Sequence, residues 1–245
     1  HNVVNEGARI GLSVSNKPVK NNVFWGYNTV RNCIQWGAQL QGETGGIAQH
    51  YFYRCVFESI VRGDERARYK NDDGHGFRTN GNCRDLVFEE CEMRNNGGYG
   101  AQLGGANVDA LSFVRCAITG NALAAVTGPR QHSALEFVDC RVTGNKSDGL
   151  PEARPFPARP PTADFQAPDS IRARQPAAFR CTSVAAAGEI AERLWDFDHG
   201  IPEVVAEPTH VYDKPGEYRV TLIVWDDAGR GARAEKTVRV LAPRR

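Results

Sequence analysis

A sequence motif repeated in the first 150 residues constrains the fold more than any other feature of this chain. It reads Leu-x-Phe-x-x-Cys, then an apolar residue two positions later, a polar turn, and a strand that begins with glycine. Clear copies and two degenerate ones occur at 28–33, 50–57, 86–93, 111–118 and 135–142. Their cysteines recur 22, 36, 25 and 24 residues apart. A period near 24 with short strands is typical of a solenoid, in which neighbouring repeats must stack to bury a core.

Each repeat divides into three short strands. The first points its Leu and Phe to one face, because side chains alternate along a strand. The cysteine follows at a tight bend, and a very short second strand carries Met93, Ile118 or Val142 inward. After a polar turn, the third strand covers 36–40, 75–79, 99–103 and 123–127, with a stub at 148–150.

The five repeat cysteines are predicted to form one inward column of reduced thiols. Buried free cysteine behaves as a small hydrophobic residue. In-line side chains on parallel strands seldom reach the dihedral angle that a disulfide requires. The column consists of Cys33, Cys55, Cys91, Cys116 and Cys140.

Three strands per coil and about 24 residues per repeat resemble the right-handed parallel β-helix of pectate-lyase-like proteins. That family usually has a ladder of asparagines at the bend, where this chain has cysteine. The resemblance implies an all-β fold with a right-handed parallel β-helix, a solenoid of about five to six rungs, over residues 1–150. Since His1 falls in mid-repeat, we expect this helix to be incomplete at its N-terminal end.

Two segments depart from the repeat. Residues 58–73 form a highly charged insertion, which must lie on the surface because no rung could bury it. Residues 150–161 carry five prolines. Because proline fixes φ and lacks a backbone donor, 151–160 is predicted to be a semi-rigid extended linker.

Residues 161–245 have a different pattern, with short alternating strands separated by turn signals, which predicts a small β-sandwich. The segments 195–200, 208–212 and 215–222 resemble a PKD domain, an immunoglobulin-like module common in secreted bacterial and archaeal enzymes and surface proteins. The usual Trp-Asp-Phe-Gly-Asp-Gly appears as Trp-Asp-Phe-Asp-His-Gly. Trp195 and Tyr218 are expected in its core, with Tyr218 in a tyrosine corner. Asp196, Asp198 and His199 are expected to brace a turn through hydrogen bonds.

Charge and hydropathy exclude two classes of partner. The net charge is +1, with 16 basic and 15 acidic residues before residue 150 and 14 of each after it. Neither half has the basic excess of a nucleic-acid-binding domain. No apolar run approaches 18 residues, so no membrane span is predicted.

The glycine-led strands define the candidate binding face. If Ala101 and Leu103 point inward, a polar column faces outward, beside a column of small residues at 11, 37, 76, 100 and 124. The members of the polar column are Ser13, Gln39, Arg78, Gln102 and Val126. A smooth strip of this kind would let a flat polymer lie near the backbone. Alternatively, the glycines serve tight packing at the turn. The predicted substrate-binding residues are Gln39, Gln102, Trp36, Tyr99, Arg130 and His132.

The densest polar cluster spans 70–78. Asp72 and Asp73 are predicted calcium ligands, since Ca²⁺ favours several oxygen ligands. Calcium would neutralise a uronate carboxylate, and Lys70, His75 or Arg78 would act as the base in β-elimination. Hydrolysis is less favoured, because adjacent aspartates face opposite ways in a strand and the polar column offers no second carboxylate. The alternative is a simple turn.

These features predict a secreted or cell-surface, carbohydrate-active protein that binds an acidic polysaccharide and, as an enzyme, would cleave it by β-elimination. The PKD-like domain favours this hypothesis, since such domains often accompany secreted polymer-degrading enzymes. Two alternatives stay open because fold does not settle chemistry. One is a non-catalytic adhesion or polysaccharide-binding structural protein. The other is the C-terminal part of a larger glycoside hydrolase.

Overall fold

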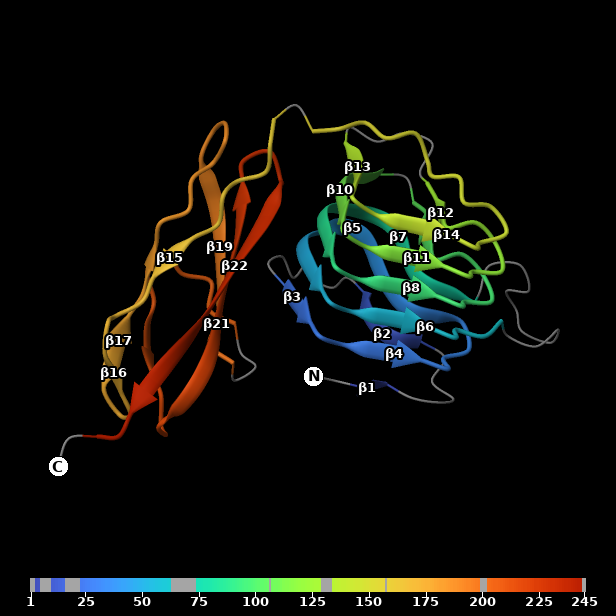
Figure 1. Ribbon diagram of the computed structural model, residues 1–245. Helices are drawn as coiled ribbons and strands as arrows, with labels where there is room; N and C mark the ends of the chain where they lie inside the picture. The colour runs from blue at the N-terminus through green and yellow to red at the C-terminus, as the bar shows by residue number, and fades with distance from the viewer. Residues whose placement is uncertain are drawn as a thin grey trace. The chain divides into compact units, whose positions relative to one another are not determined.

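The computed structural model describes residues 3–4, 10–15, 23–62, 74–105, 107–128, 134–156, 158–198 and 202–243. All regular elements in these ranges are β-strands. The chain divides into two compact units, the first formed mainly by residues up to Phe156 and the second by those after it (Figure 1). Within the described ranges there is no helix of the length and apolarity that a membrane span needs.

One side of the first unit is a sheet of very short parallel strands. Thr29, Val56, Glu92, Ala117 and Arg141 are aligned in register, so successive partners are 27, 36, 25 and 24 residues apart. The middle residues of these strands are buried, which confirms the inward prediction for Met93 and Ile118 and places Val142 partly buried. The strands, in sheet order, are β1 (Val3–Val4), β4 (Thr29–Arg31), β6 (Val56–Glu58), β8 (Glu92–Arg94), β11 (Ala117–Thr119) and β14 (Arg141–Thr143).

A second sheet bends around the rest of the first unit. Residues 36–42 of β5 pair in parallel with 75–81 of β7, and after a register shift 47–53 pair with residues from 83 to 89. One long strand therefore supplies two consecutive faces of the repeat. The strands are β2 (Ile10–Ser15), β3 (Val23–Gly26), β5 (Trp36–Tyr53), β7 (His75–Glu89), β9 (Ala101–Leu103), β10 (Asn107–Val114), β12 (Val126–Thr127) and β13 (Leu135–Val138).

The phenylalanines of the repeated motif form a stacked column in the core. Adjacent ring centroids of Phe52, Phe88, Phe113 and Phe137 lie 4.7, 4.7 and 5.1 Å apart, with interplanar angles of 5–17°. The preceding leucines are in register alongside them. The inward prediction for the Leu-x-Phe strand is confirmed, and offset stacking adds to the free energy gained by burying each ring.

The predicted column of five cysteines is wrong at its first position. The register places Asn28, rather than Cys33, before Cys55, and the Asn28 amide donates to Cys55 Sγ at 3.9 Å. The bend residue is the one that precedes the very short strand, and at 29–31 that strand lies before Cys33. The remaining prediction is confirmed, since all seven cysteines are free thiols. The thiols of Cys91, Cys116 and Cys140 donate to core-strand carbonyl groups at 3.2–3.4 Å.

An asparagine ladder is present, at the other end of the short strands. Asn121 Oδ1 accepts from the backbone N–H of Asn96 at 3.2 Å and from its amide at 2.9 Å. The Asn121 amide donates to the carbonyl of Met93 at 3.0 Å and to Asn145 Oδ1 at 2.6 Å. The inference that cysteine had replaced the ladder is therefore wrong, because the two side-chain columns occupy different bends.

Asp148 ends this ladder. Its carboxylate accepts from the backbone N–H of Asn145 at 2.9 Å and from the side-chain amide at 2.7 Å. These hydrogen bonds hold the pKa of Asp148 below its ordinary value. A carboxylate thus takes the place that the next asparagine would occupy.

The start of the proline-rich segment belongs to the first unit. The backbones of Leu135 in β13 and Arg154 exchange two hydrogen bonds of 2.9 Å in an antiparallel bridge. Leu150 also packs against the core of this unit. Residues 150–156 thus do more than connect two domains, because they also cover the last strand of the sheet.

The second unit is a sandwich of short and long strands that pair antiparallel, except that β16 pairs with β22 in parallel. Its core contains Phe165, Phe179, Trp195 and Phe197. A four-stranded sheet in the order β16-β22-β21-β19 contributes one layer, and the pairs β15-β18 and β17-β20 complete the fold. The bounds are β15 (Phe165–Gln166), β16 (Ile171–Arg172), β17 (Pro176–Ala178), β18 (Arg180–Cys181), β19 (Ile190–Asp196), β20 (Thr209–Val211), β21 (Gly216–Asp226) and β22 (Gly231–Leu241).

Two local predictions for this unit are confirmed. Tyr218 packs against the core and its hydroxyl donates to the carbonyl of Lys214 at 2.9 Å, as in a tyrosine corner. Asp196 Oδ1 accepts from the backbone N–H of Asp198 at 3.0 Å, and Asp198 accepts from that of Arg219 at 3.3 Å. The aspartates therefore brace a turn; His199 lies outside the described residues.

Candidate functional site

The predicted polar column is present on β2, β5, β7, β9 and β12. The register joins Ser13 to Gln39, Gln39 to Arg78, and Arg78 to Gln102. The last member is wrong: Thr127 pairs with Gln102, whereas Val126 pairs with Ala101 and is buried. A shift of one residue along a strand moves a side chain to the other face, which explains the error. The polar column hereafter means Ser13, Gln39, Arg78, Gln102 and Thr127.

Arg78 lies at the middle of the polar column, in contact with an aromatic ring. Its guanidinium carbon is 4.5 Å from the centroid of the Trp36 ring. Trp36 is buried, and Arg78 and Gln102 are partly buried. A guanidinium stacked on indole gains cation–π attraction and loses much of its freedom of movement. The column therefore presents one positioned cation between the amides of Gln39 and Gln102.

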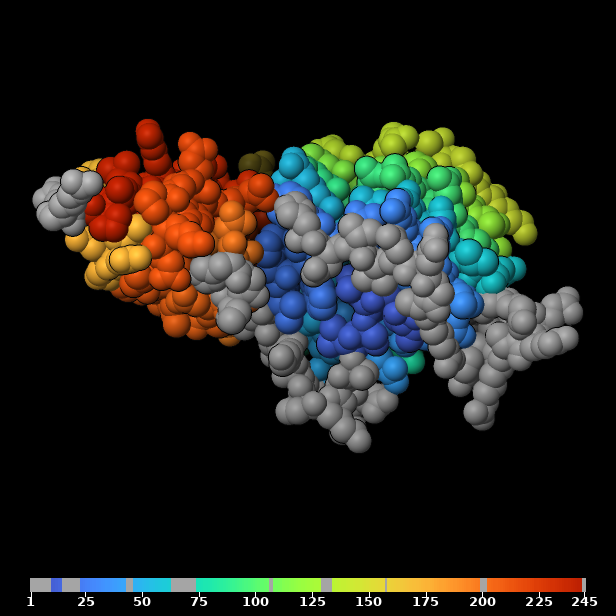
Figure 2. Space-filling view, turned by 90° about the horizontal axis from the view of Figure 1, so that it is seen from below, coloured from blue at the N-terminus to red at the C-terminus, as the bar shows by residue number. Residues whose placement is uncertain are grey.

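The exposed start of the polar column belongs to β2, whose residues are seen in dark blue at the surface in Figure 2. Ser13 is exposed there, whereas Gln39 on the next strand is only 5 % exposed. Burial thus varies along the column, and the partly accessible groups are those of Arg78, Gln102 and Thr127.

His75 and Tyr99 occupy the same repeat position as Trp36. Trp36 and His75 are in register, and His75 Nδ1 accepts a hydrogen bond of 3.1 Å from the backbone N–H of Tyr99. His75 has no exposed surface, whereas Tyr99 is partly exposed. A base must reach the proton that it removes. The burial of His75 therefore gives no support to its predicted role as the base. Of His75 and Tyr99, only Tyr99 is accessible to a ligand.

The column of small residues serves tight packing. A Cβ atom built on Gly76 would lie 2.7 Å from both the Asn96 amide nitrogen and the Gly100 carbonyl oxygen. Gly37, Gly76 and Gly100 are themselves buried. These glycines let adjacent repeats approach each other closely, and they do not form a smooth strip open to a polymer.

Five of the predicted site residues lie outside the described part of the chain: Lys70, Asp72, Asp73, Arg130 and His132. Their proposed roles as base, calcium ligands and substrate contacts stay predictions. In the described ranges, no group of three or more His, Cys, Asp or Glu side chains is arranged to hold a metal ion.

A charged ladder that sequence reasoning missed runs along the cysteine bend. The residues that precede the cysteines alternate in sign, as Arg54, Glu90, Arg115 and Asp139. Glu90 accepts from Arg54 at 2.7 Å and from Arg115 at 3.2 Å, and Arg115 also pairs with Glu89. Burial acts to raise the pKa of Glu90, but the hydrogen bonds from both arginines outweigh it and lower that pKa. These groups satisfy one another, so the ladder serves structure.

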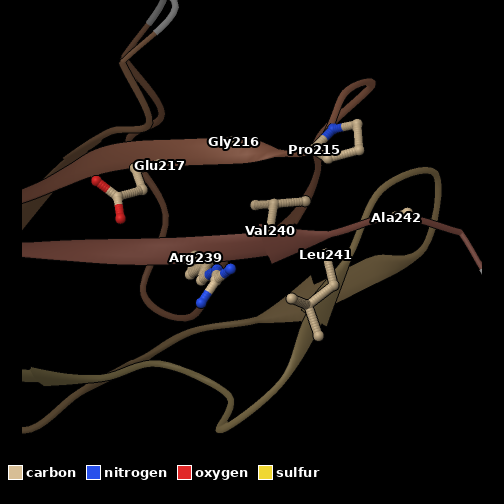
Figure 3. Close-up of a pocket in the computed structure, with 7 residues that line it drawn as sticks. All are labelled: Pro215, Gly216, Glu217, Arg239, Val240, Leu241 and Ala242. Carbon is tan, nitrogen blue, oxygen red and sulfur yellow. The ribbon is translucent and has the colours of Figure 1, made fainter.

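The second unit carries an open groove of about 590 Å³ at one end of β21 and β22. Figure 3 shows that Glu217 and Arg239 come from these two adjacent strands, with Val240 and Leu241 further along β22. The groove is lined by one carboxylate, one guanidinium and several apolar residues. Its lining residues are Pro215, Gly216, Glu217, Arg239, Val240, Leu241 and Ala242. No motif in the sequence indicated it.

Comparison with known proteins identifies the second unit. Residues 158–241 match the PKD domain family. The chain is 45% identical over 53 residues to collagenase ColQ1 of Bacillus cereus, which is 22% of this chain and 6% of that protein. It is 42% identical over 62 residues to the pre-pro-metalloprotease PrtV of Vibrio cholerae, which is 25% of this chain and 7% of that protein. The chain therefore spans less than a tenth of the length of these relatives.

Solved structures of PKD domains are among those similar to this chain. The PKD1 domain of Vibrio anguillarum Epp is 27% identical, with 35% of this chain and 99% of that chain covered and a TM-score of 0.33. The PKD1 domain of Vibrio cholerae PrtV is 34% identical, with 34% and 98% covered and a TM-score of 0.31. The PKD prediction is confirmed by the family match: the chain is all-β, and its second unit is a PKD domain with an immunoglobulin-like sandwich.

Proposed function

We propose that this chain is an extracellular polysaccharide-binding protein whose first unit holds an acidic polymer along the polar column. In this proposal, residues 1–150 are a right-handed parallel β-helix, 151–160 a connection, and 161–245 the PKD domain. Parallel pairing one repeat apart and the stacked asparagine and phenylalanine columns support the β-helix. The observation that carries the binding function is the guanidinium of Arg78 on the Trp36 ring, between two amides.

The chemistry of these side chains favours an anionic sugar. A guanidinium presents a planar set of donors that matches a carboxylate or sulfate. The partly exposed amide of Gln102 and hydroxyl of Thr127 can donate to and accept from sugar hydroxyl groups, whereas Gln39 is nearly buried beside Arg78. Adjacent strands are about 4.8 Å apart, so consecutive side chains of the column suit consecutive groups of an extended polymer.

The PKD domain supports an extracellular location and an accessory role. Its relatives are named as collagenases and a pre-pro-metalloprotease, in which the matched region is a small part of a long chain. We infer that here, too, the domain accompanies another activity by binding polysaccharide or protein.

Cleavage by β-elimination is a narrower hypothesis. It requires a base, for which Lys70 and Arg78 are the candidates, and calcium held by Asp72 and Asp73. Arg78 alone of these lies within the described residues. The contacts of Arg78 bear on binding, and cleavage stays a separate proposal that depends on Lys70, Asp72 and Asp73.

The test compares affinity for charged and neutral polysaccharides by isothermal titration calorimetry. Arg78→Gln should weaken binding to a polyuronate or sulfated polymer about tenfold, corresponding to about 1.4 kcal/mol for one charge-assisted pair. Arg141→Gln is the matched control, because Arg141 is exposed on the opposite sheet of the same unit. Equal affinity for neutral polymers, or an unchanged Arg78→Gln variant, would refute the proposal. Ultraviolet absorbance of unsaturated uronates, with calcium or chelator, tests cleavage in the same samples.

A further inference from the structure

We propose that His75 is a positioning residue, whose imidazole fixes the backbone of Tyr99 and so sets the Tyr99 ring as an aromatic contact surface beside the polar column. The part of this inference that concerns a ligand rests on the proposed function. The part that concerns His75 and Tyr99 rests on geometry alone.

The segment around Tyr99 needs an external support because its sequence is flexible. Tyr99 lies in Gly97-Gly98-Tyr99-Gly100, and β9 begins only at Ala101. Glycine has the largest backbone entropy to lose on folding. Three glycines next to one tyrosine therefore leave the direction of its ring poorly determined by local preference.

Hydrogen bonds from β7 and the residue before it supply that support. The N–H of Gly98 donates to the carbonyl of Gly74 at 2.8 Å, and the carbonyl of Tyr99 accepts from the N–H of Gly76 at 3.0 Å. The N–H of Tyr99 donates to a side chain, His75 Nδ1, at 3.1 Å. A backbone donor needs a partner, and here the imidazole acts as the acceptor.

Histidine is the member of this repeat position that can perform the task. The corresponding residue one repeat earlier is Trp36, whose indole nitrogen is a donor only. Acceptance at Nδ1 requires the neutral tautomer that carries its proton on Nε2. Since His75 is fully buried, it acts on a ligand only through Tyr99.

The ring of Tyr99 also contacts the imidazole. The two centroids are 5.1 Å apart at an interplanar angle of 40°. Tyr99 is partly exposed, so a fixed ring there offers an aromatic face to a sugar. One repeat position thus places two aromatic rings, those of Trp36 and Tyr99, beside the polar column, with His75 between them.

Two variants separate the acceptor from the ring. His75→Asn retains an acceptor close to the place of Nδ1, whereas His75→Phe retains a ring and removes the acceptor. Hydrogen exchange of the Tyr99 amide, measured by NMR, should stay slow in wild type and H75N and become at least tenfold faster in H75F. Equally slow exchange in H75F would overturn the positioning role. Imidazole ¹⁵N shifts of wild type give a test that needs no variant, since an Nδ1–H tautomer would also overturn it.

Binding to the polyuronate defined above tests the functional part. Tyr99→Leu and H75F should each weaken binding about tenfold, and the double variant should bind no more weakly than either single one. H75N should recover wild-type affinity. If H75F alters amide exchange but not affinity, the contact-surface role of Tyr99 is overturned. If wild type binds no polymer, the proposed function fails, while the exchange experiment still decides whether His75 positions Tyr99.

Discussion

Replacing Asn121 by alanine should show how strongly the asparagine ladder stabilises the first unit. Asn121 is 1 % exposed, and its side chain accepts two hydrogen bonds from Asn96 and donates one each to Met93 and Asn145. Alanine fits the same backbone but makes none of these four bonds. The substitution therefore removes these hydrogen bonds together with the volume of the side-chain amide.

The expected loss follows from the groups that stay buried. The backbone N–H of Asn96 and the carbonyl of Met93 would lose these partners in the interior, and each such group costs about 1–3 kcal/mol. The Asn96 amide retains its bond to the carbonyl of Phe57 at 3.2 Å. The free energy of unfolding should therefore fall by about 3–5 kcal/mol. Asn145→Ala is the control, because Asn145 is more exposed and water can replace its bonds, so about 1 kcal/mol is expected.

Differential scanning calorimetry is the assay, because the two units have separate cores and a multidomain chain need not unfold in one step. The transition of the first unit should move to lower temperature in Asn121→Ala, while that of the PKD domain stays in place as an internal reference. If Asn121→Ala shifts the transition no further than Asn145→Ala does, the buried hydrogen bonds of Asn121 do not stabilise the unit.

Three further predictions concern the same unit. Phe88→Leu should destabilise it by about 2–3 kcal/mol by urea unfolding, since its ring stacks on two neighbours, whereas Phe137→Leu at the column end should cost about 1 kcal/mol; equal effects would contradict the stacking argument. Because hydrogen bonds lower the folded-state pKa of Asp148, its stabilisation is present above the unfolded value of about 3.9 and is lost as pH falls below it. Asp148→Asn should therefore flatten the acid-side decline in Tm, and an unchanged decline would count against the cap. Burial raises the pKa of Cys83 to about 11, so a thiol reagent at about pH 8 should modify it only after unfolding; mass spectrometry of the labelled peptides would reveal earlier modification.

The parts of the fold that follow from side-chain alternation could be predicted from sequence. Phe88 and Phe113 point inward because period two leaves them no other face once their leucines are buried. The PKD domain could be predicted because its motif residues have local roles, such as the Tyr218 hydroxyl bond to Lys214.

The parts that depend on register could not be predicted in the same way. Cys33 matched the repeat by residue type, but alignment on the strand at 29–31 puts Asn28 in the cysteine column. The asparagine ladder has a sequence signal at 96, 121 and 145, but these residues recur with the same period as the cysteines, so the period alone does not show which column forms the ladder. For the site, the burial of His75 could not be predicted, because this residue adjoins a turn, where side-chain alternation does not fix the face. An error of one residue in the register placed Val126 in the polar column instead of Thr127.

The bridge between Leu135 and Arg154 has a consequence for solubility. The last strand of a parallel stack exposes a row of backbone donors and acceptors on which another chain can add a strand. A covering strand would ordinarily present a new row of its own. Here the covering segment carries Pro151 and Pro155, which lack backbone donors, and among the described residues its β-bridge to β13 is at Arg154. The protein thus closes its own edge with a segment that is a poor template for the next molecule, and fibre-like growth from that end is discouraged by sequence.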